Sequence, residues 1–463
     1  MYKTKYMLDY KIKDDHVIIN TITGAIDIID NKVKCWMDAL NANKIDDNSI
    51  DEGTKNALKQ RGYIFDSVND EKSLINRVEA YANKIREEDI CNEFIILPSL
   101  GCNLRCTYCF ESTDQHIKYD TMKNEDLKAI LDYIYVVKTK YEQNHKRQKL
   151  FSIRIFGGEP LLPQNGEIVK RILEFSCENK IKVNIVTNGT ILEPYWDLLK
   201  KYKAIVYLQI TLDGAIEIHD KRRIRIDGSG TFNEITKNIN RLLDENFKLN
   251  IRINLDKDNI DGLAALEQIA KDNGWDKNEN AIIYASPVLN FSGNSDSTLQ
   301  EHELIEELVD RGYGNSDSSF IKSIVSPCIG FLNMFFNPNK ENQFCKTHYC
   351  GATSKQELCF SPDGKITTCL TYCGKNKFDI GTFDKKGVHL DEDKYKMWTE
   401  RTVFRIDGCI DCKYAFLCGG GCAAMAIDTN GEIDNKVCSD IKETIDSFMN
   451  KIIINKLQND SFL

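Results

Sequence analysis

Six segments with the pattern of β-strands recur between residues 91 and 290, and helical patterns separate them. In the clearest helix, Leu127, Ile130, Leu131 and Ile134 recur at helical spacing. Strands that alternate with helices form parallel sheets with right-handed crossovers, and six units fall short of the eight that close a full barrel. The sequence therefore predicts an α/β fold with a partial, open (β/α)6 barrel. The expected strands are Phe94–Leu97, Ile153–Phe156, Val183–Val186, Ile205–Ile210, Asn250–Asn254 and Ala281–Tyr284.

Short polar segments that contain glycine directly follow the first four of these strands. A single Gly-Gly or Asn-Gly pair would be an ordinary turn between a strand and a helix. In a barrel of parallel strands, however, the loops after the strand C-termini meet at one rim and carry the chemistry. The sequence therefore predicts one binding site built from all four segments, which are Gly101–Phe110, Gly157–Pro160, Thr187–Gly189 and Thr211–Gly214.

The first of these segments holds three cysteines, Cys102, Cys106 and Cys109, in the spacing Cys-x3-Cys-x2-Cys. Three thiolates on one short loop can hold a cubane iron–sulfur cluster by three of its irons. A purely structural or electron-transfer [4Fe–4S] site takes four cysteines. The missing ligand leaves a coordination position open, as in catalytic metal sites. We interpret the open iron as the binding position of S-adenosylmethionine (SAM).

The neighbouring segments offer groups that suit the parts of SAM. Glu159 would accept hydrogen bonds from the methionine amino group, and Asn188 would bond to the ribose. Thr211 and one of two adjacent arginines, Arg222 or Arg223, would hold the methionine carboxylate, and we choose Arg223. Glycines let the backbone approach a ligand closely, and a tyrosine gives a flat face for adenine. The predicted SAM-binding residues are Tyr108, Gly157, Gly158, Glu159, Pro160, Asn188, Thr211 and Arg223.

The C-terminal third is rich in cysteine. Of 17 cysteines in the chain, 11 fall between Cys328 and Cys438. Such density in a reducing compartment indicates metal binding or catalysis. Seven of the cysteines follow one pattern of spacing in the sequence. Cys345 makes eight, a number that suits two four-cysteine clusters. Zinc remains the alternative for the later group. A β-hairpin is expected between 358–360 and 365–367, and the seven are Cys350, Cys369, Cys409, Cys412, Cys418, Cys422 and Cys438.

Residues 1–90 form a unit of their own. A strand at 17–19, a turn at 21–24 and a strand at 25–29 indicate a small β-hairpin. Helices are expected from Asp30 onward, over 51–60 and over 71–88, and a return strand over 63–65. This winged-helix-like plan resembles the peptide-binding modules of enzymes that modify ribosomally made peptides. A structural cap on the barrel is the alternative.

Composition limits the classes of function. The chain has 463 residues, of which 42% are hydrophobic and 28% charged, so it is globular and large enough for two or three domains. A net charge of −9 argues against a general nucleic-acid binder. No apolar run approaches the ~20 residues of a membrane helix, and the N-terminus has no signal-peptide core. We therefore expect a cytoplasmic protein that binds neither nucleic acid nor membrane.

Taken together, the four rim segments resemble those of the radical SAM enzymes, and the seven-cysteine tail resembles their SPASM extension. The resemblance implies three [4Fe–4S] clusters and SAM as cofactors. It also implies a low-potential electron donor such as ferredoxin or flavodoxin. Electron transfer into the first cluster would cleave SAM to methionine and a 5′-deoxyadenosyl radical, which removes a hydrogen atom from the substrate.

The resemblance further implies how the chain divides and how the cysteines pair with clusters. Residues 1–90 would recognise a leader peptide, 91–310 would form the barrel, and 311–463 would form the SPASM domain. Cys328 competes with Cys345 for the nearer auxiliary cluster, and if neither binds, a substrate thiolate could fill the open iron. The nearer cluster would use Cys345, Cys350, Cys369 and Cys422, and the outer one Cys409, Cys412, Cys418 and Cys438.

SPASM enzymes mostly act on peptides and proteins, so a precursor peptide is the expected partner. We expect a thioether from a cysteine sulfur to carbon, with carbon–carbon cross-linking as an alternative. Formylglycine formation, as in anaerobic sulfatase maturases, would place an aspartate directly after the second SPASM cysteine, where this chain has Leu370. A non-catalytic iron–sulfur or zinc protein is the alternative of another class, and it would not cleave SAM.

Overall fold

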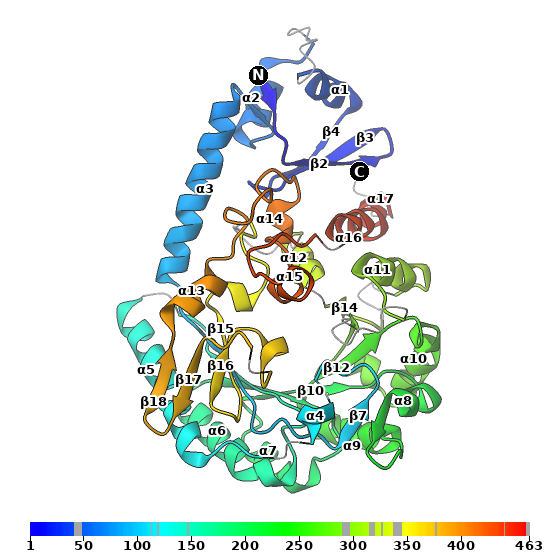
Figure 1. The fold of residues 1–463 in the computed structure, drawn as a ribbon. Coiled ribbons are helices and arrows are strands. Elements are labelled where there is room, and N and C mark those ends of the chain that lie inside the picture. The colour runs from blue at the N-terminus through cyan, green and yellow to red at the C-terminus, as the bar shows by residue number, and fades with distance from the viewer. Residues whose placement is uncertain are drawn as a thin grey trace.

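A single open sheet organises the barrel and continues into the C-terminal region (Figure 1). The computed structural model describes residues 1–40, 49–111, 113–117, 120–145, 148–288, 297–313, 320–325, 327–336, 345–375, 377–438 and 440–459. Within them, eleven strands follow the order β14-β13-β12-β10-β9-β8-β6-β15-β16-β17-β18. The parallel strands are β6 (Glu93–Ile96), β8 (Ser152–Ile155), β9 (Lys182–Thr187), β10 (Val206–Thr211), β12 (Lys248–Leu255), β13 (Ala281–Pro287) and β14 (Ser323–Ile324).

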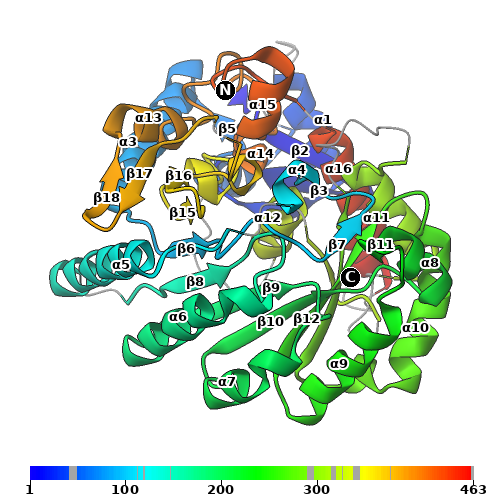
Figure 2. The ribbon, with the colours of Figure 1, turned by 60° about the horizontal axis from the view of Figure 1, so that its bottom comes forward.

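All six predicted strands are confirmed, and the two-residue β14 adds a seventh at one edge. The sheet curves without closing, and helices cover its outer face (Figure 2). Their apolar faces explain this placement: in α9, for example, Ile235, Ile239 and Leu242 are fully buried. The barrel helices are α5 (Asn124–Asn144), α6 (Gly166–Glu178), α7 (Trp196–Lys201), α8 (Ile216–Arg222), α9 (Phe232–Asp244), α10 (Leu263–Asp272) and α11 (Glu301–Asp310).

The two faces of the barrel strands differ in chemistry. On β12, Leu249, Ile251 and Ile253 belong to the buried core shared with the helices. The alternate residues of the same strand, Asn250 and Arg252, line a cavity inside the barrel instead. The same alternation on β9 and β10 makes the barrel interior polar, because side chains point to opposite faces along a strand.

The C-terminal cysteine region begins as an extension of the barrel sheet. Strand β15 runs parallel to β6, with Glu357 opposite Glu93, and β16 returns antiparallel. The predicted hairpin is confirmed, but its pairing with the barrel was not foreseen, because it depends on contacts distant in sequence. Further elements are β15 (Glu357–Phe360), β16 (Lys365–Thr367), β17 (Gly381–Asp384), β18 (Gly387–Leu390), α12 (Pro327–Phe335), α13 (Glu392–Thr399), α14 (Ala415–Cys418), α15 (Ala423–Asn430), α16 (Ile441–Ser447) and α17 (Asn455–Asn459).

A three-stranded antiparallel sheet forms the N-terminal unit, in the order β2-β3-β4. One face, with Leu8 and Val17, joins the main core, and the other, with Ile18, packs beneath α1 together with Trp36 and Met37. The predicted hairpin is therefore part of a larger sheet. The elements are β1 (Tyr2–Lys3), β2 (Met7–Ile12), β3 (Asp15–Asn20), β4 (Ile26–Ile29), α1 (Asn31–Leu40), α2 (Glu52–Gln60), β5 (Ile64–Phe65) and α3 (Val68–Glu88).

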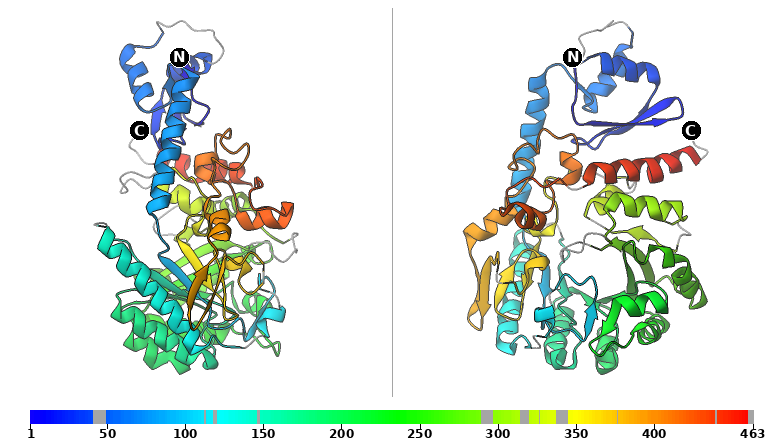
Figure 3. Two further views of the ribbon diagram at one scale, coloured as in Figure 1. Left: turned by 60° about the vertical axis from the view of Figure 1, so that its left-hand side comes forward. Right: turned by 45° about the vertical axis from the view of Figure 1, so that its right-hand side comes forward.

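The N-terminal unit sits on the C-terminal region, and the long helix α3 connects it to the barrel (Figure 3). Tyr10 donates a hydrogen bond to Asp446 (2.8 Å), and Thr21 donates one to the carbonyl of Lys413 (2.9 Å). These contacts join residues about 400 positions apart. Among the helices that the structure describes, none has the length and apolar character to cross a membrane.

Candidate functional site

The cysteine loop follows β6 directly and is held by a short ladder. Strand β7 (Leu104–Cys106) pairs antiparallel with β11 (Arg223–Arg225), so that Arg223 lies opposite Cys106. The Cys102 amide donates to the carbonyl of His116 (3.1 Å), which ties the start of the loop to α4 (Thr113–His116). The backbone thereby brings the three predicted cluster ligands and Arg223 to one place.

One cavity of about 610 Å³ lies inside the barrel, and it connects two regions that the sequence separates. Cys102, Cys106 and Cys109 line one part of it, and Leu370 and Thr371, which follow Cys369, line another. The wall between them carries both polar and apolar side chains. Its polar residues from the barrel strands include Arg154, Asn184, Tyr207, Gln209, Asn250, Arg252, Asn254 and Tyr284.

The three loop thiols suit a metal cluster. Burial raises the pKa of Cys102 and Cys106, and burial with the nearby Glu111 raises the pKa of Cys109 to about 12. Such thiols stay protonated without a metal, and a bound metal takes them as thiolates. Among the described residues that line the cavity, there is no fourth cysteine. The donor set therefore fits a cluster with one iron left open.

Gly157 and Gly158 pack against the start of the cysteine loop. A Cβ on Gly157 would lie 2.4 Å from the carbonyl oxygen of Ser99, and its φ of +135° already favours glycine. A Cβ on Gly158 would lie 2.3 Å from the carbonyl oxygen of Gly101. Both glycines also line the cavity. Their missing side chains therefore permit loop-to-loop packing as well as the predicted approach of a ligand.

Glu159 is completely buried and is bonded within the protein. Its carboxylate accepts hydrogen bonds from the Leu161 amide (2.9 Å), the Thr187 hydroxyl (2.7 Å) and the Asn188 amide (2.6 Å). Burial raises its pKa, and these three donors oppose that rise. Glu159 therefore joins the loop after β8 to the loop after β9. Its contact with SAM stays a prediction, as does that of the neighbouring Pro160.

Asn188 connects the third rim segment to the cysteine loop. Its side-chain amide donates to Asn103 (2.8 Å), and its oxygen accepts from the Thr190 amide (2.9 Å). Asn188 and Thr211 both line the cavity, as the sequence predicted for residues that contact SAM. The bond to Asn103 means that Asn188 also fixes the orientation of the loop between the first and second cysteines.

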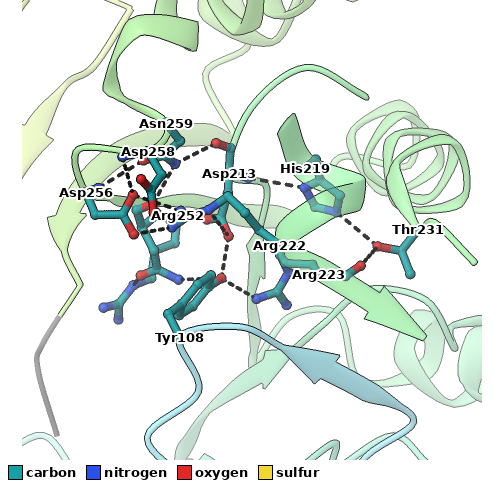
Figure 4. A network of polar contacts seen from close by, with 11 residues as sticks. Tyr108, Asp213, His219, Arg222, Arg223, Thr231, Arg252, Asp256, Asp258 and Asn259 are labelled. Atoms are coloured by element: carbon teal, nitrogen blue, oxygen red, sulfur yellow. Dashed lines mark hydrogen bonds and ion pairs between the residues drawn. The ribbon is translucent and has the colours of Figure 1, made fainter. Parts of the chain in front are cut away.

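Tyr108 is the centre of a polar network (Figure 4). Its hydroxyl donates to the Asp213 carboxylate and accepts from Arg223 (2.8 Å) and from Asn254 (3.1 Å). Three groups from three other segments therefore meet at the Tyr108 oxygen atom. Tyr108 lines the cavity, but its hydroxyl serves the protein, which leaves the ring face as the part available to a ligand.

The two candidate arginines have different environments. Arg222 makes a two-pronged ion pair with Asp256 (both contacts 2.8 Å) and lies over the Tyr108 ring at 4.9 Å. Arg223 lines the cavity, whereas Arg222 is not among its described lining residues. The Nε atoms of both arginines are buried without a hydrogen-bond partner among the described residues. Because Arg222 is already paired with Asp256, the geometry favours Arg223 over Arg222 for an anionic ligand.

His219 connects Asp213 to the backbone of Arg223 through a chain of hydrogen bonds. Its Nδ1 accepts from the Asp213 amide (3.2 Å), so the proton is on Nε2, which donates to the Thr231 hydroxyl (3.0 Å). Thr231 in turn donates to the Arg223 carbonyl (2.8 Å). Burial, with Arg223 and Arg222 nearby, lowers the pKa of His219 to about 3. The imidazole is therefore neutral and positions the Arg223 backbone.

The predicted auxiliary ligands fall into different surroundings. Burial and the nearby thiols of Cys350 and Cys422 raise the pKa of Cys369, so these three share one neighbourhood. Cys409 lies close enough to Cys418 and Cys438 for their charges to act on it. Cys345 instead belongs to an apolar cluster with Tyr6, Val403 and Phe416 that also contains Cys409 and Cys412. The place of Cys345 in the nearer cluster stays a prediction.

Two groups of cavity residues were not predicted. The first comprises the polar residues of the cavity wall, which the alternating patterns of β9, β10 and β12 could have revealed. The second lies beside Cys109, where the His116 Nε2 is 3.4 Å from the sulfur and 3.3 Å from the Glu111 carboxylate. No sequence motif predicts this second group, because Cys109, Glu111 and His116 are brought together by a short loop and α4.

Comparison with known proteins agrees with this donor set. Residues 96–269 match the Radical SAM superfamily. The chain is also 24% identical over 458 residues to the radical SAM cyclopropyl synthase TigE of Paramaledivibacter caminithermalis. That similarity covers 93% of this chain and 91% of TigE.

Solved structures share the fold. Native anSMEcpe with bound AdoMet and Cp18Cys peptide is 20% identical with a TM-score of 0.60, over 80% of this chain and 99% of that one. Streptococcus suis SuiB bound to precursor peptide SuiA is 16% identical with a TM-score of 0.55, over 95% and 99%. The superfamily match over residues 96–269 and the three thiols at one cavity show that this enzyme carries a radical SAM domain, which uses SAM and an iron–sulfur cluster.

Proposed function

We propose that this enzyme modifies a ribosomally made precursor peptide. The observation that carries the proposal is the shape of the cavity. It runs from the three loop cysteines to Leu370 and Thr371, beside Cys369. With a cluster on the loop and SAM bound, the pair supplies the one-electron cleavage that yields a 5′-deoxyadenosyl radical. A substrate residue in the cavity would lie between that site and the C-terminal cysteines.

The chain's own residues would bind and orient SAM. Thr211 and Arg223 would hold its carboxylate, and the Tyr108 ring would lie beside the adenine. The Tyr108 hydroxyl, fixed by Asp213 and Asn254, keeps Arg223 in place. Gly157, Gly158, Glu159, Pro160 and Asn188 complete the proposed SAM site. Hydrogen bonds within the protein hold Tyr108 and Arg223 in place, and such preorganisation lowers the cost of binding.

We propose two further [4Fe–4S] clusters in the C-terminal region, which makes three in total. Cys350, Cys369 and Cys422, with Cys345 as fourth ligand, would hold the nearer cluster. The shared neighbourhood of Cys350, Cys369 and Cys422 supports these three ligands, and Cys345 is proposed from the family resemblance alone. The outer cluster would use Cys409, Cys412, Cys418 and Cys438, which the charge contacts of Cys409 support. A low-potential donor such as ferredoxin or flavodoxin would supply electrons.

Residues 1–90 would hold the leader of the precursor, while 91–310 form the barrel and 311–463 the SPASM domain. Strand β4 (Ile26–Ile29) pairs with β3 alone among the described strands, so it offers an edge that an extended peptide could join. The likeness to SuiB bound to precursor peptide SuiA extends over 95% of this chain and supports such a partner. A tethered leader raises the effective concentration of the core peptide at the cavity.

The bond that we propose is a thioether between a cysteine sulfur and a carbon of the peptide. Carbon–carbon bond formation is the second candidate, and the relationship to the cyclopropyl synthase TigE along 93% of the chain favours it. Formylglycine formation has less support. The position that directly follows Cys369 carries Leu370, an apolar residue that lines the cavity, where an acidic residue would be needed.

The test uses anaerobically reconstituted enzyme, SAM, a reductant and the peptide encoded beside its gene. We expect 5′-deoxyadenosine, an iron content of roughly twelve per chain for three four-iron clusters, and the loss of two hydrogen atoms per cross-link in the peptide mass. Alkylation separates the candidates, since a thioether consumes a thiol and a carbon–carbon link does not. SAM cleavage without any change in peptide mass would refute the peptide substrate.

A further inference from the structure

The middle of the barrel cavity carries positive charge. Arg154 on β8 and Arg252 on β12 line it from different strands. Both are close enough to the Tyr284 hydroxyl for their charges to lower its pKa, while burial raises it. The acidic residue among the described lining residues is Glu111, which belongs to the cysteine end with His116. The middle of the cavity therefore has arginines without an acidic wall.

The cations that line the cavity differ in what compensates their charge. Arg154 forms an ion pair with Glu93. Arg223 bonds to Tyr108, whose hydroxyl is bonded to Asp213. Arg252 donates to the side-chain oxygens of Asn254 (2.7 Å) and Ser286 (3.0 Å), both of them neutral. Within the described residues no carboxylate lies within ion-pair distance of Arg252, so its charge is the least compensated of the three.

Among the described strands, Arg252 does not pair with the cysteine loop as Arg223 does, and it borders the proposed SAM site through its cross-strand partner Thr211. Arg223 lies opposite Cys106 in the ladder that holds the cysteine loop. Arg252 instead pairs across strands with Thr211 on one side and Tyr284 on the other. Figure 4 shows Arg252 at the edge of the network around Tyr108. Its neighbours on β13, Tyr284 and Ser286, lie on the side away from β10.

The groups beside Arg252 can donate hydrogen bonds to a ligand that has several oxygen atoms. Tyr284 donates its hydroxyl hydrogen to the Gln209 oxygen (2.7 Å). The Gln209 amide hydrogens remain as donors, and Gln209 lines the cavity. Arg252 donates to Asn254 and Ser286 and is also hydrogen-bonded to the Tyr284 hydroxyl, which leaves the rest of its five N–H donors for a ligand. Guanidinium and amide donors on adjacent strands match the two oxygens of a carboxylate.

We propose that Arg252, together with Gln209, binds a carboxylate of the substrate in the middle of the barrel. This deepens the proposed function and rests on it, because the carboxylate would belong to the peptide whose residue is modified. The source is either an aspartate or glutamate side chain or the C-terminal carboxylate of the peptide. A bound carboxylate would neutralise Arg252 and hold the neighbouring residue of the peptide beside the SAM site.

The test measures binding and does not depend on turnover. The probes are N-acetyl-aspartate N-methylamide and its asparagine counterpart, and N-acetylglycine and its N-methylamide. Ligand-observed NMR measures their affinity for reconstituted, SAM-saturated enzyme. We expect at least one acid to bind about tenfold or more better than its neutral partner, the effect of a charge-assisted hydrogen bond. The probe pair in which the acid binds better identifies the source of the carboxylate, either a side chain or the C-terminus of the peptide.

Three variants decide whether Arg252 is responsible. Arg252→Gln should abolish the preference for the acid, and Arg252→Lys should keep part of it. Arg171→Gln is the matched control, because Arg171 bonds to Asn124 at the surface, outside the cavity. Iron content and SAM affinity are measured on each variant, so that a folding defect is visible.

Three results would overturn the proposal. The first is equal binding of acid and neutral probes by the unmodified enzyme. The second is an acid preference that persists in Arg252→Gln. The third is a loss of SAM affinity in Arg252→Gln with the probe preference intact, which would assign Arg252 to SAM. A failure of the proposed peptide function would appear separately, as an unchanged peptide mass in the turnover assay.

Discussion

The cysteines of the rim loop and those of the C-terminal region are assembled in different ways. Cys102, Cys106 and Cys109 come from one short loop, held by the β7–β11 ladder and the Tyr108 network. The C-terminal cysteines come from segments before, within and after β15–β18, and β15 itself is a strand of the barrel sheet. The first site is therefore encoded locally, whereas the second depends on the whole fold.

The largest expected effect is on SAM cleavage, and it distinguishes the rim loop from the C-terminal cysteines. Cys106→Ala removes a ligand of the rim loop, so the formation of 5′-deoxyadenosine should fall by about 100-fold or more. Cys438→Ala should instead lower the iron content by about four per chain while the rim cluster stays intact. Iron analysis and chromatography of the SAM products measure both. The control is Cys177→Ala, which changes an exposed thiol. SAM cleavage that survives in Cys106→Ala would contradict the site.

Gly158→Ala tests the close packing on which the rim loop depends. The new Cβ would lie 2.3 Å from the Gly101 oxygen and 2.4 Å from the Leu100 oxygen, so the cysteine loop must move. A displacement of this size should slow SAM cleavage by about 10- to 100-fold. Gly166→Ala is the control, because its nearest neighbour atom would be 3.9 Å away. Equal activity of the two variants would show that the loop adapts.

His219 makes the support of the rim site sensitive to acid. Its folded pKa of about 3 lies below the ordinary value of 6.5, so the unfolded chain binds the proton first. Stability is therefore complete above pH 6.5 and is lost as the pH falls toward 3. Between pH 7.5 and 5.0 this amounts to about 2 kcal/mol.

Replacing the imidazole should remove this dependence. In His219→Gln, urea unfolding midpoints at pH 7.5 and 5.0 should differ less than they do in the unmodified protein. Gln retains an acceptor for the Asp213 amide and a donor for Thr231. An unchanged difference between the two midpoints would mean that other groups cause the acid sensitivity.

The smallest expected effect is on the contact between the N-terminal sheet and the C-terminal region. Tyr10→Phe removes the hydrogen bond to Asp446, which joins the N-terminal sheet to the C-terminal region. One such bond contributes about 1 kcal/mol. We expect faster hydrogen exchange in β2 and near-normal SAM cleavage, measured by mass spectrometry and product analysis. A large loss of SAM cleavage would show that the N-terminal unit controls the rim site, against the contrast drawn between the two regions.

Much of the barrel and the rim could be predicted from local pattern. The six strands, the helical faces and the rim segments follow from residue spacing within short windows. The same approach missed β2 of the N-terminal sheet and the polar residues of the cavity wall. Both alternate regularly in the sequence, but alternation alone does not tell whether the polar face of a strand meets water or lines a cavity. Glu159 shows the limit of a motif: its residue type suggested a ligand group, and the structure adds three donors from its own chain.

The sequence by itself determined the chemistry at the rim, because the spacing of three cysteines on one loop sets the number of thiolates that can meet. It also determined the barrel, since alternating strand and helix patterns leave few ways to bury apolar faces. Only the tertiary structure decided that Arg223 and not Arg222 faces the cavity, and that β15 extends the barrel sheet. Those outcomes depend on contacts between residues far apart in the chain: Asp256, for example, pairs with Arg222, while Arg223 lines the cavity.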